Sequence, residues 1–176
     1  MRFRHCLFAS AVCMLLINAT PLPAATAESV DLASIDACSL LTQAEMSAAV
    51  GAPMGPGRHA PAPAGNASCS WQWLASFSKM GPPPHLVVVS VQLSVVPFVK
   101  WRFEQQKELA APTSATDVAG LGDEAYYYVQ SKIMNILNVR RGSIEIQLMV
   151  VTGDAPDQQS VLDSERTIAA QVLSEL

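Results

Sequence analysis

The feature that most constrains this sequence is an alternation of apolar and polar side chains near its C-terminus. Over residues 143–151 every second residue is apolar, so that Ile144, Ile146, Leu148 and Val150 alternate with Glu145, Gln147 and Met149. A period of two places the first set on one face of a β-strand. Arg141-Gly142 separates this run from a second apolar run at residues 133–140, which predicts a tight hairpin. We therefore expect an antiparallel sheet with one apolar face.

Three other segments have the composition and alternation of strands, namely residues 68–73, 86–96 and 124–129. In the first segment Cys69, Trp71 and Trp73 fall on one face. In the second, apolar residues alternate with serine and glutamine, so we expect the other face of the sheet to be polar and only partly covered. Residues 51–67 are rich in proline, glycine and alanine and are expected to form a loop.

Two helices are indicated by capping residues or by an apolar stripe. Thr42 and Glu45 fit a capping box, in which the hydroxyl and the carboxylate each accept a backbone N–H, and Gly51 is placed to end this helix. Residues 157–176 predict a long amphipathic helix, whose buried side carries Val161, Ile168, Val172 and Leu176.

A third helix is expected after Pro97, because proline suits a first helical turn. Lys100 and Glu104 can pair across one turn of this helix. One stripe of it carries Phe98, Trp101, Gln105 and Leu109. We expect this stripe to pack on the sheet, with Trp101 in the contact.

These elements predict a single α+β domain with one curved antiparallel sheet and helices packed mainly on one face. Two successive groups of strands, each followed by a helix, also suggest an internal duplication.

The N-terminus has the organisation of a secretory signal peptide. Arg2 and Arg4 precede a run of 14 nearly uncharged residues at 6–19, and Ala25-Thr26-Ala27 offers small residues for cleavage. About 20 apolar residues are needed to span a bilayer, which disfavours the alternative of an uncleaved anchor. We therefore expect residues 1–27 to be removed and residues 28–176 to form the exported domain. No cysteine lies in a good lipidation sequence, so a soluble periplasmic or extracellular protein without a transmembrane span is predicted.

Only Cys38 and Cys69 remain after this cleavage. A pair of cysteines in an oxidising compartment most simply forms one disulfide, which would stabilise the fold by roughly 3–4 kcal/mol. The alternative is a pair of free, buried thiols. We expect no metal site, because His59 and His85 lack neighbouring residues at ligand spacing.

The charges and motifs exclude some classes of protein and support few reactions. The predicted exported chain carries nine basic and fifteen acidic side chains without a basic cluster, which disfavours nucleic acid as a partner. His59 and His85 lie in proline-rich stretches and are interpreted as exposed loop residues. Asp123-Glu124 is interpreted as a turn and strand start, because neighbours on a strand point to opposite faces. No cofactor is expected.

Two stretches of the chain resemble a known family. The first is Ala37-Cys38-Ser39-Leu40-Leu41-Thr42, with Cys69-Ser70-Trp71 further along. The second is Val118-Ala119-Gly120-Leu121-Gly122-Asp123-Glu124-Ala125-Tyr126. Over residues 36–176 the chain resembles a family of small exported bacterial domains of unknown function, common among actinobacterial lipoproteins. The resemblance implies an envelope location and a Cys38–Cys69 pair, and it carries over no catalytic residue.

The remaining candidates for a ligand site are aromatic. Trp71, Trp73, Trp101 and Tyr127 would line a groove for an apolar or carbohydrate ligand on one interpretation, and would simply pack the core on the other. The predicted function is a non-enzymatic cell-envelope or secreted module that binds a ligand or a partner protein. The alternatives are a small hydrolase or transferase with a dispersed site, and an inhibitor of an extracellular enzyme that uses a loop such as residues 78–85.

Overall fold

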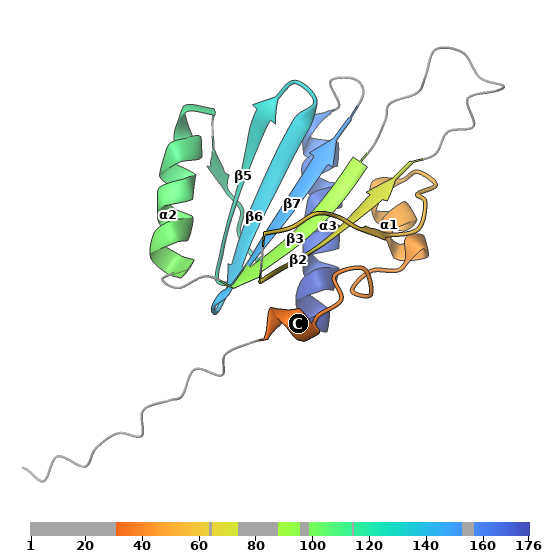
Figure 1. Cartoon of the computed structure of the whole chain (residues 1–176). Helices are drawn as coiled ribbons and strands as arrows, with labels where there is room; N and C mark the ends of the chain where they lie inside the picture. Colours follow the sequence, from red (N-terminus) through yellow and green to blue (C-terminus); the bar gives the residue numbers. More distant parts are fainter. Residues whose placement is uncertain (1–30, 64, 74–87, 96–98, 114, 153–156) are drawn as a thin grey trace, which may run out of the picture.

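The computed structural model describes residues 31–63, 65–73, 88–95, 99–113, 115–152 and 157–176. The predicted signal peptide, His85, Phe98 and the loop at 78–85 lie outside these residues. The described part forms one α+β domain, as predicted, with three α-helices and a seven-stranded sheet in which every pair of neighbouring strands is antiparallel (Figure 1).

The strands follow each other across the sheet in an order that puts the two halves of the chain side by side. From one edge to the other they are β1 (Arg58–His59), β2 (Asn66–Gln72), β3 (Val88–Val95), β7 (Ile144–Val151), β6 (Met134–Arg141), β5 (Glu124–Ser131) and β4 (Thr116–Asp117). The predicted hairpin joins β6 and β7, and Gly142 supplies its positive φ of 58°. The stretch at 51–67 is not all loop, because β1 lies within it and β2 begins at Asn66.

One face of the sheet carries the main core, under α1 (Gln43–Val50), α3 (Gln158–Glu175) and the short 3₁₀ helix η1 (Leu32–Ser34). The alternating side chains of β2, β3, β6 and β7 point into it, including Trp71, Val91, Leu137, Ile146 and Leu148, each fully buried. Burial of a side chain of this size contributes roughly 1.5–3 kcal/mol, so this face provides most of the stability. The first helix, α1, begins with the predicted Thr42–Glu45 capping box. The predicted C-terminal helix, α3, begins one residue later than expected, because the Asp157 side chain caps it.

The third helix, α2 (Val99–Ala110), covers part of the other face. Its Phe103 ring meets the Tyr126 ring edge-on, with centroids 4.9 Å apart. The expected contact stripe is wrong, because Trp101 is 61% exposed and Leu109 is 81% exposed. The helix has two uncharged stripes roughly 120° apart, and the stripe that is buried carries Val99, Phe103 and Ala110.

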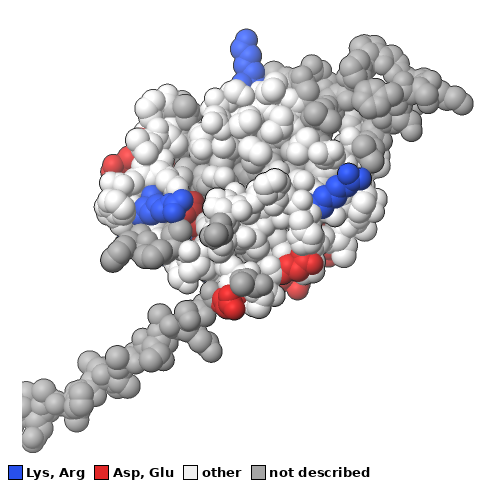
Figure 2. All heavy atoms as spheres, in the orientation of Figure 1, with Lys and Arg blue, Asp and Glu red and all other residues white. Residues whose placement is uncertain are grey.

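The polar face of the sheet is left partly open beside α2. Ser90, Gln92 and Gln147 are half-buried there, as the alternation predicted. Figure 2 shows the molecule in the orientation of Figure 1, with charged side chains towards the rim of this face and uncharged residues at its centre. The helices that follow the two strand groups, α2 and α3, lie on opposite faces, and the internal duplication stays a prediction.

The Cys38–Cys69 disulfide is present and joins the turn at residues 36–39 to β2. Close packing surrounds it, since a Cβ atom on Gly57 would lie 2.9 Å from Cys69 Sγ. Within the described residues, no helix has the length and hydropathy needed to cross a membrane.

Candidate functional site

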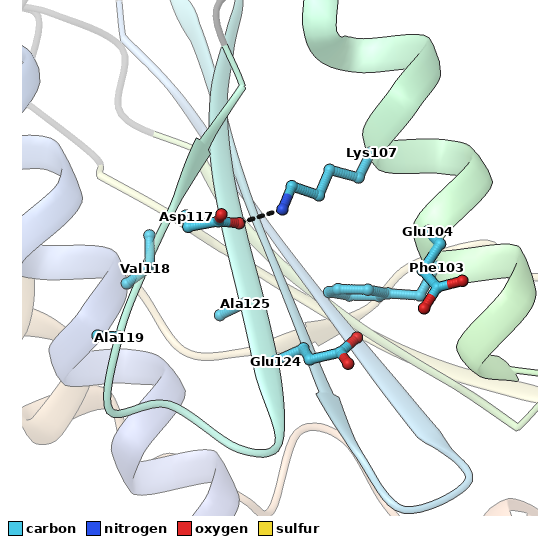
Figure 3. Close-up of a pocket in the computed structure, with 8 residues that line it drawn as sticks. All are labelled: Phe103, Glu104, Lys107, Asp117, Val118, Ala119, Glu124 and Ala125. Atoms are coloured by element: carbon cyan, nitrogen blue, oxygen red, sulfur yellow. Dashed lines mark hydrogen bonds and ion pairs between the residues drawn. The ribbon is translucent and has the colours of Figure 1, made fainter.

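A groove of about 440 Å³ separates α2 from the β4–β5 edge of the sheet (Figure 3). This volume lies within the range of about 300–1,000 Å³ that is usual for small-molecule sites. Eight of the residues that the structure describes line the groove, namely Phe103, Glu104, Lys107, Asp117, Val118, Ala119, Glu124 and Ala125. We refer to it as the α2 groove.

The helical wall of the α2 groove is fixed by the packing of α2 on the sheet. Phe103, Glu104 and Lys107 occupy positions i, i+1 and i+4, so they project from neighbouring parts of the helix surface. Phe103 is 2% exposed and is held by its edge-on contact with Tyr126. The base of the groove is therefore apolar, while its rim on this side is charged (Figure 3).

The opposite wall is fixed by a clamp between the turn before β5 and the β6–β7 hairpin. The Asp123 carboxylate accepts hydrogen bonds from Arg140 Nη1 at 2.9 Å and from the Gly142 amide at 2.8 Å. The Asp123 amide donates to the Arg140 carbonyl at 2.7 Å. Gly122 has a φ of 56°, and a Cβ atom there would lie 2.4 Å from that carbonyl oxygen. Asp123 thus serves as a turn residue and Glu124 begins β5, as predicted.

The charges in the α2 groove are unbalanced. Lys107 on α2 pairs with Asp117 on β4 across the groove (Figure 3). Glu104 lies 3.9 Å from Lys100, and Glu124 lies 3.4 Å from Arg140 Nε. The described lining residues therefore hold three carboxylates and one ammonium group, and the other two basic partners, Lys100 and Arg140, lie outside the lining.

The two glutamates leave room for a further cationic partner. Their side chains are 55% exposed for Glu104 and 38% exposed for Glu124. The Glu104–Lys100 contact is a surface pair worth about 0–1 kcal/mol, whereas Glu124 pairs with Arg140, whose side chain is only 12% exposed.

The four aromatic candidates do not meet on one surface. Trp71 is fully buried and Tyr127 is 7% exposed, both in the core under α3. Trp73 is half-buried and bridges to Met54, whereas Trp101 is exposed on α2, on the other side of the sheet. The aromatic ring that lines the groove is Phe103, whose stripe with Val99 and Ala110 was readable in the sequence.

Two buried carboxyl groups lie outside the groove. Glu165 on α3 is fully buried, and neither of its carboxyl oxygens makes a hydrogen bond of good geometry. Burial raises the pKa of Glu165 well above its ordinary value, and the nearby Val150 amide offsets this only in part. Burial also raises the pKa of Glu145 under α2, against a lowering effect of Arg102. Tyr127 donates a hydrogen bond to Asn135 at 2.8 Å, and burial followed by the charge of Glu165 raises the pKa of Tyr127 to about 12.

His59 lies on β1, at the opposite edge of the sheet from the α2 groove. It is exposed, as predicted, but it is not isolated, because Asp36 lies 3.7 Å away. Arg140 and Arg141 at the hairpin are both engaged internally, Arg140 by Asp123 and Arg141 by the Leu173 carbonyl.

Comparison with known proteins returned no match to a family model, to a curated protein or to a solved structure. The resemblance to small exported domains stays a prediction, and the function has to be inferred from the geometry of the chain itself.

Proposed function

We propose that this protein is an exported, non-enzymatic binding module whose ligand occupies the α2 groove. The observation that carries the proposal is the groove itself, which combines an apolar base at Phe103 with an excess of carboxylates on its rim. An exported location is supported by the N-terminal pattern and by the Cys38–Cys69 disulfide, a bond that persists in oxidising compartments.

The fixed walls support a binding role. One wall is anchored by the Phe103–Tyr126 ring contact, and the other by the hydrogen bonds between Asp123 and the β6–β7 hairpin. A site that is already formed loses little conformational entropy when a ligand enters. Binding energy from a small contact area is then sufficient for a measurable affinity.

The chemistry of the lining favours a ligand with an apolar body and a cationic head. The body would contact Phe103, which is buried at the base, and would pass over Val118 and Ala125, whose side chains belong to the main core. The head would lie between Glu104 and Glu124, whose side chains are 55% and 38% exposed and whose basic partners do not line the groove. An anionic head would instead meet the excess of negative charge.

Isothermal titration calorimetry with three matched probes tests this proposal. 4-Phenylbutylamine, 4-phenylbutanol and 4-phenylbutyrate share one apolar body and differ in the charge of the head group. We expect the amine to bind most tightly and the acid most weakly, and we expect the amine to lose at least tenfold in affinity in a Glu104→Gln/Glu124→Gln variant. Glu108→Gln is the matched control, since Glu108 is exposed on α2 and does not line the groove. Equal affinities for the three probes would refute the cationic preference.

A further inference from the structure

A cluster of metal-ligating side chains lies at the β1 edge of the sheet, away from the α2 groove. Asp36, Cys38 and His59 each place one ligand atom within 4.8 Å of the other two. Cys69 adds a fourth, because it is bonded to Cys38 and is the direct cross-strand partner of His59 in the β1–β2 pair. Three ligand atoms therefore lie close together, and the second sulfur is bonded to one of them from its buried position on β2.

The disulfide determines whether this cluster can bind a metal. Sulfur atoms joined in a disulfide are not thiolates, and the thiolate is the form that ligates a metal. We propose that reduction of the Cys38–Cys69 bond by a dithiol converts the cluster into a tetrahedral zinc site with Cys38, Cys69, His59 and Asp36 as its ligands. The dithiol gives two electrons and two protons to the protein's disulfide and itself becomes a disulfide. Each protein thiol then releases its proton when Zn²⁺ binds.

The ligand set fits zinc better than other common cations. Zinc takes cysteine, histidine and carboxylate ligands in tetrahedral sites, at about 2.0–2.3 Å from the metal. Such bond lengths place the ligand atoms roughly 3.3–3.8 Å from one another. The ligand atoms of Asp36, Cys38 and His59 lie at most 4.8 Å apart, with 3.7 Å between His59 Nε2 and Asp36 Oδ1, so they are close to this geometry. The two sulfurs would reach it by moving apart once their bond is broken.

The backbone around the cluster keeps these ligands in place. Asp36 Oδ1 accepts a hydrogen bond from the Cys38 amide at 2.8 Å, and the turn is closed by the Ser39 amide, which donates to the Asp36 carbonyl at 2.9 Å. Cys69 is fully buried on β2 and cannot move far, whereas Cys38 lies half-buried in the turn and can rotate away once the bond is broken. The side chains of His59 and Asp36 are 75% and 53% exposed, so a metal can enter from solvent.

The zinc ion would replace the disulfide as the link between the turn at 36–39 and the sheet. The link would then persist in oxidising and in reducing surroundings, by a covalent bond in the first and by metal coordination in the second. This role does not depend on what the α2 groove binds.

Cobalt titration of the reduced protein tests the inference, because tetrahedral Co²⁺–thiolate sites have a distinctive visible absorption. The protein is reduced with a phosphine, which does not compete strongly for the metal, and Co²⁺ and then Zn²⁺ are added. We expect one Co²⁺ per chain in the reduced protein, displacement by Zn²⁺, and no uptake by the oxidised protein. His59→Ala should weaken binding at least tenfold, while Arg58→Ala, its neighbour on β1, should leave it unchanged.

Folding of the variants and of the reduced chain is checked in the same experiment. Melting curves of the oxidised proteins establish that both variants fold. For the reduced protein, Zn²⁺ should raise the melting temperature, since the metal binds the folded arrangement. Absence of cobalt uptake, equal affinity of His59→Ala and the unaltered protein, or a melting temperature that zinc does not raise would each overturn the proposed site.

Discussion

Replacing Glu165 by glutamine should stabilise the protein at neutral pH. Glu165 is fully buried on α3 without a well-formed hydrogen bond, and burial raises its pKa well above the ordinary value of 4.5. The folded protein therefore holds a proton at this group at pH values where the unfolded chain has released it. Glutamine has the same shape and does not ionise. The free energy of unfolding of Glu165→Gln therefore no longer depends on this proton.

The sign and size of the effect follow from proton linkage. A raised folded pKa contributes stability that is fully present below pH 4.5 and is lost as the pH rises towards the folded pKa. Within that window the loss is about 1.4 kcal/mol for each pH unit. The stability of the unaltered protein therefore falls with pH over the whole range in which the fold keeps this proton and the unfolded chain has released it.

Urea unfolding between pH 4 and pH 8 measures this contribution. The free energy of unfolding should fall more steeply with pH in the unaltered protein than in Glu165→Gln, and the two should converge near pH 4. Glu145 also has a raised pKa and adds a slope of the same sign to both proteins, so the difference between them isolates Glu165. Glu175→Gln, at an exposed position of the same helix, is the control. Parallel curves for Glu165→Gln and the unaltered protein would refute the reasoning.

Two further predictions concern the links that hold the fold together. Cys38→Ser should lower the melting temperature by about 10 °C, because the disulfide, by closing a loop, stabilises the fold by roughly 3–4 kcal/mol. An unchanged melting curve in differential scanning calorimetry would contradict this. Gly122→Ala should destabilise the fold by more than about 1 kcal/mol in urea unfolding, since φ is 56° and the added Cβ would lie 2.4 Å from the Arg140 carbonyl oxygen. Gly120→Ala, at a φ of 81° with open space around it, should cost less, and equal losses for both would argue against the contact with Arg140.

The local elements could be predicted from the sequence because their signals are local. The Thr42–Glu45 capping box, the turn at Gly142 and the alternation in β7 each depend on residues a few positions apart. The orientation of α2 could not be predicted, because its two uncharged stripes are equivalent until a partner surface, here Tyr126, selects one of them.

The sites depend on contacts between distant parts of the chain. The α2 groove forms only where α2 meets β4 and β5, and the His59–Cys69 pairing requires the β1–β2 register. The helical spacing did indicate where Glu165 lies, because Glu165 occupies the position between Val161 and Ile168 that completes the buried stripe of Val161, Ile168 and Val172. A charged residue at that step does not indicate burial without the structure.

The most direct test of the binding proposal is to locate the ligand by NMR. Amide ¹H–¹⁵N spectra recorded during titration with 4-phenylbutylamine should change at Phe103, Val118, Ala119 and Ala125, around the α2 groove. Residues at the β1 edge, such as Arg58 and His59, should be unaffected. Changes confined to any other surface, or none at saturating concentrations of the amine, would contradict the assignment of the α2 groove as the ligand site.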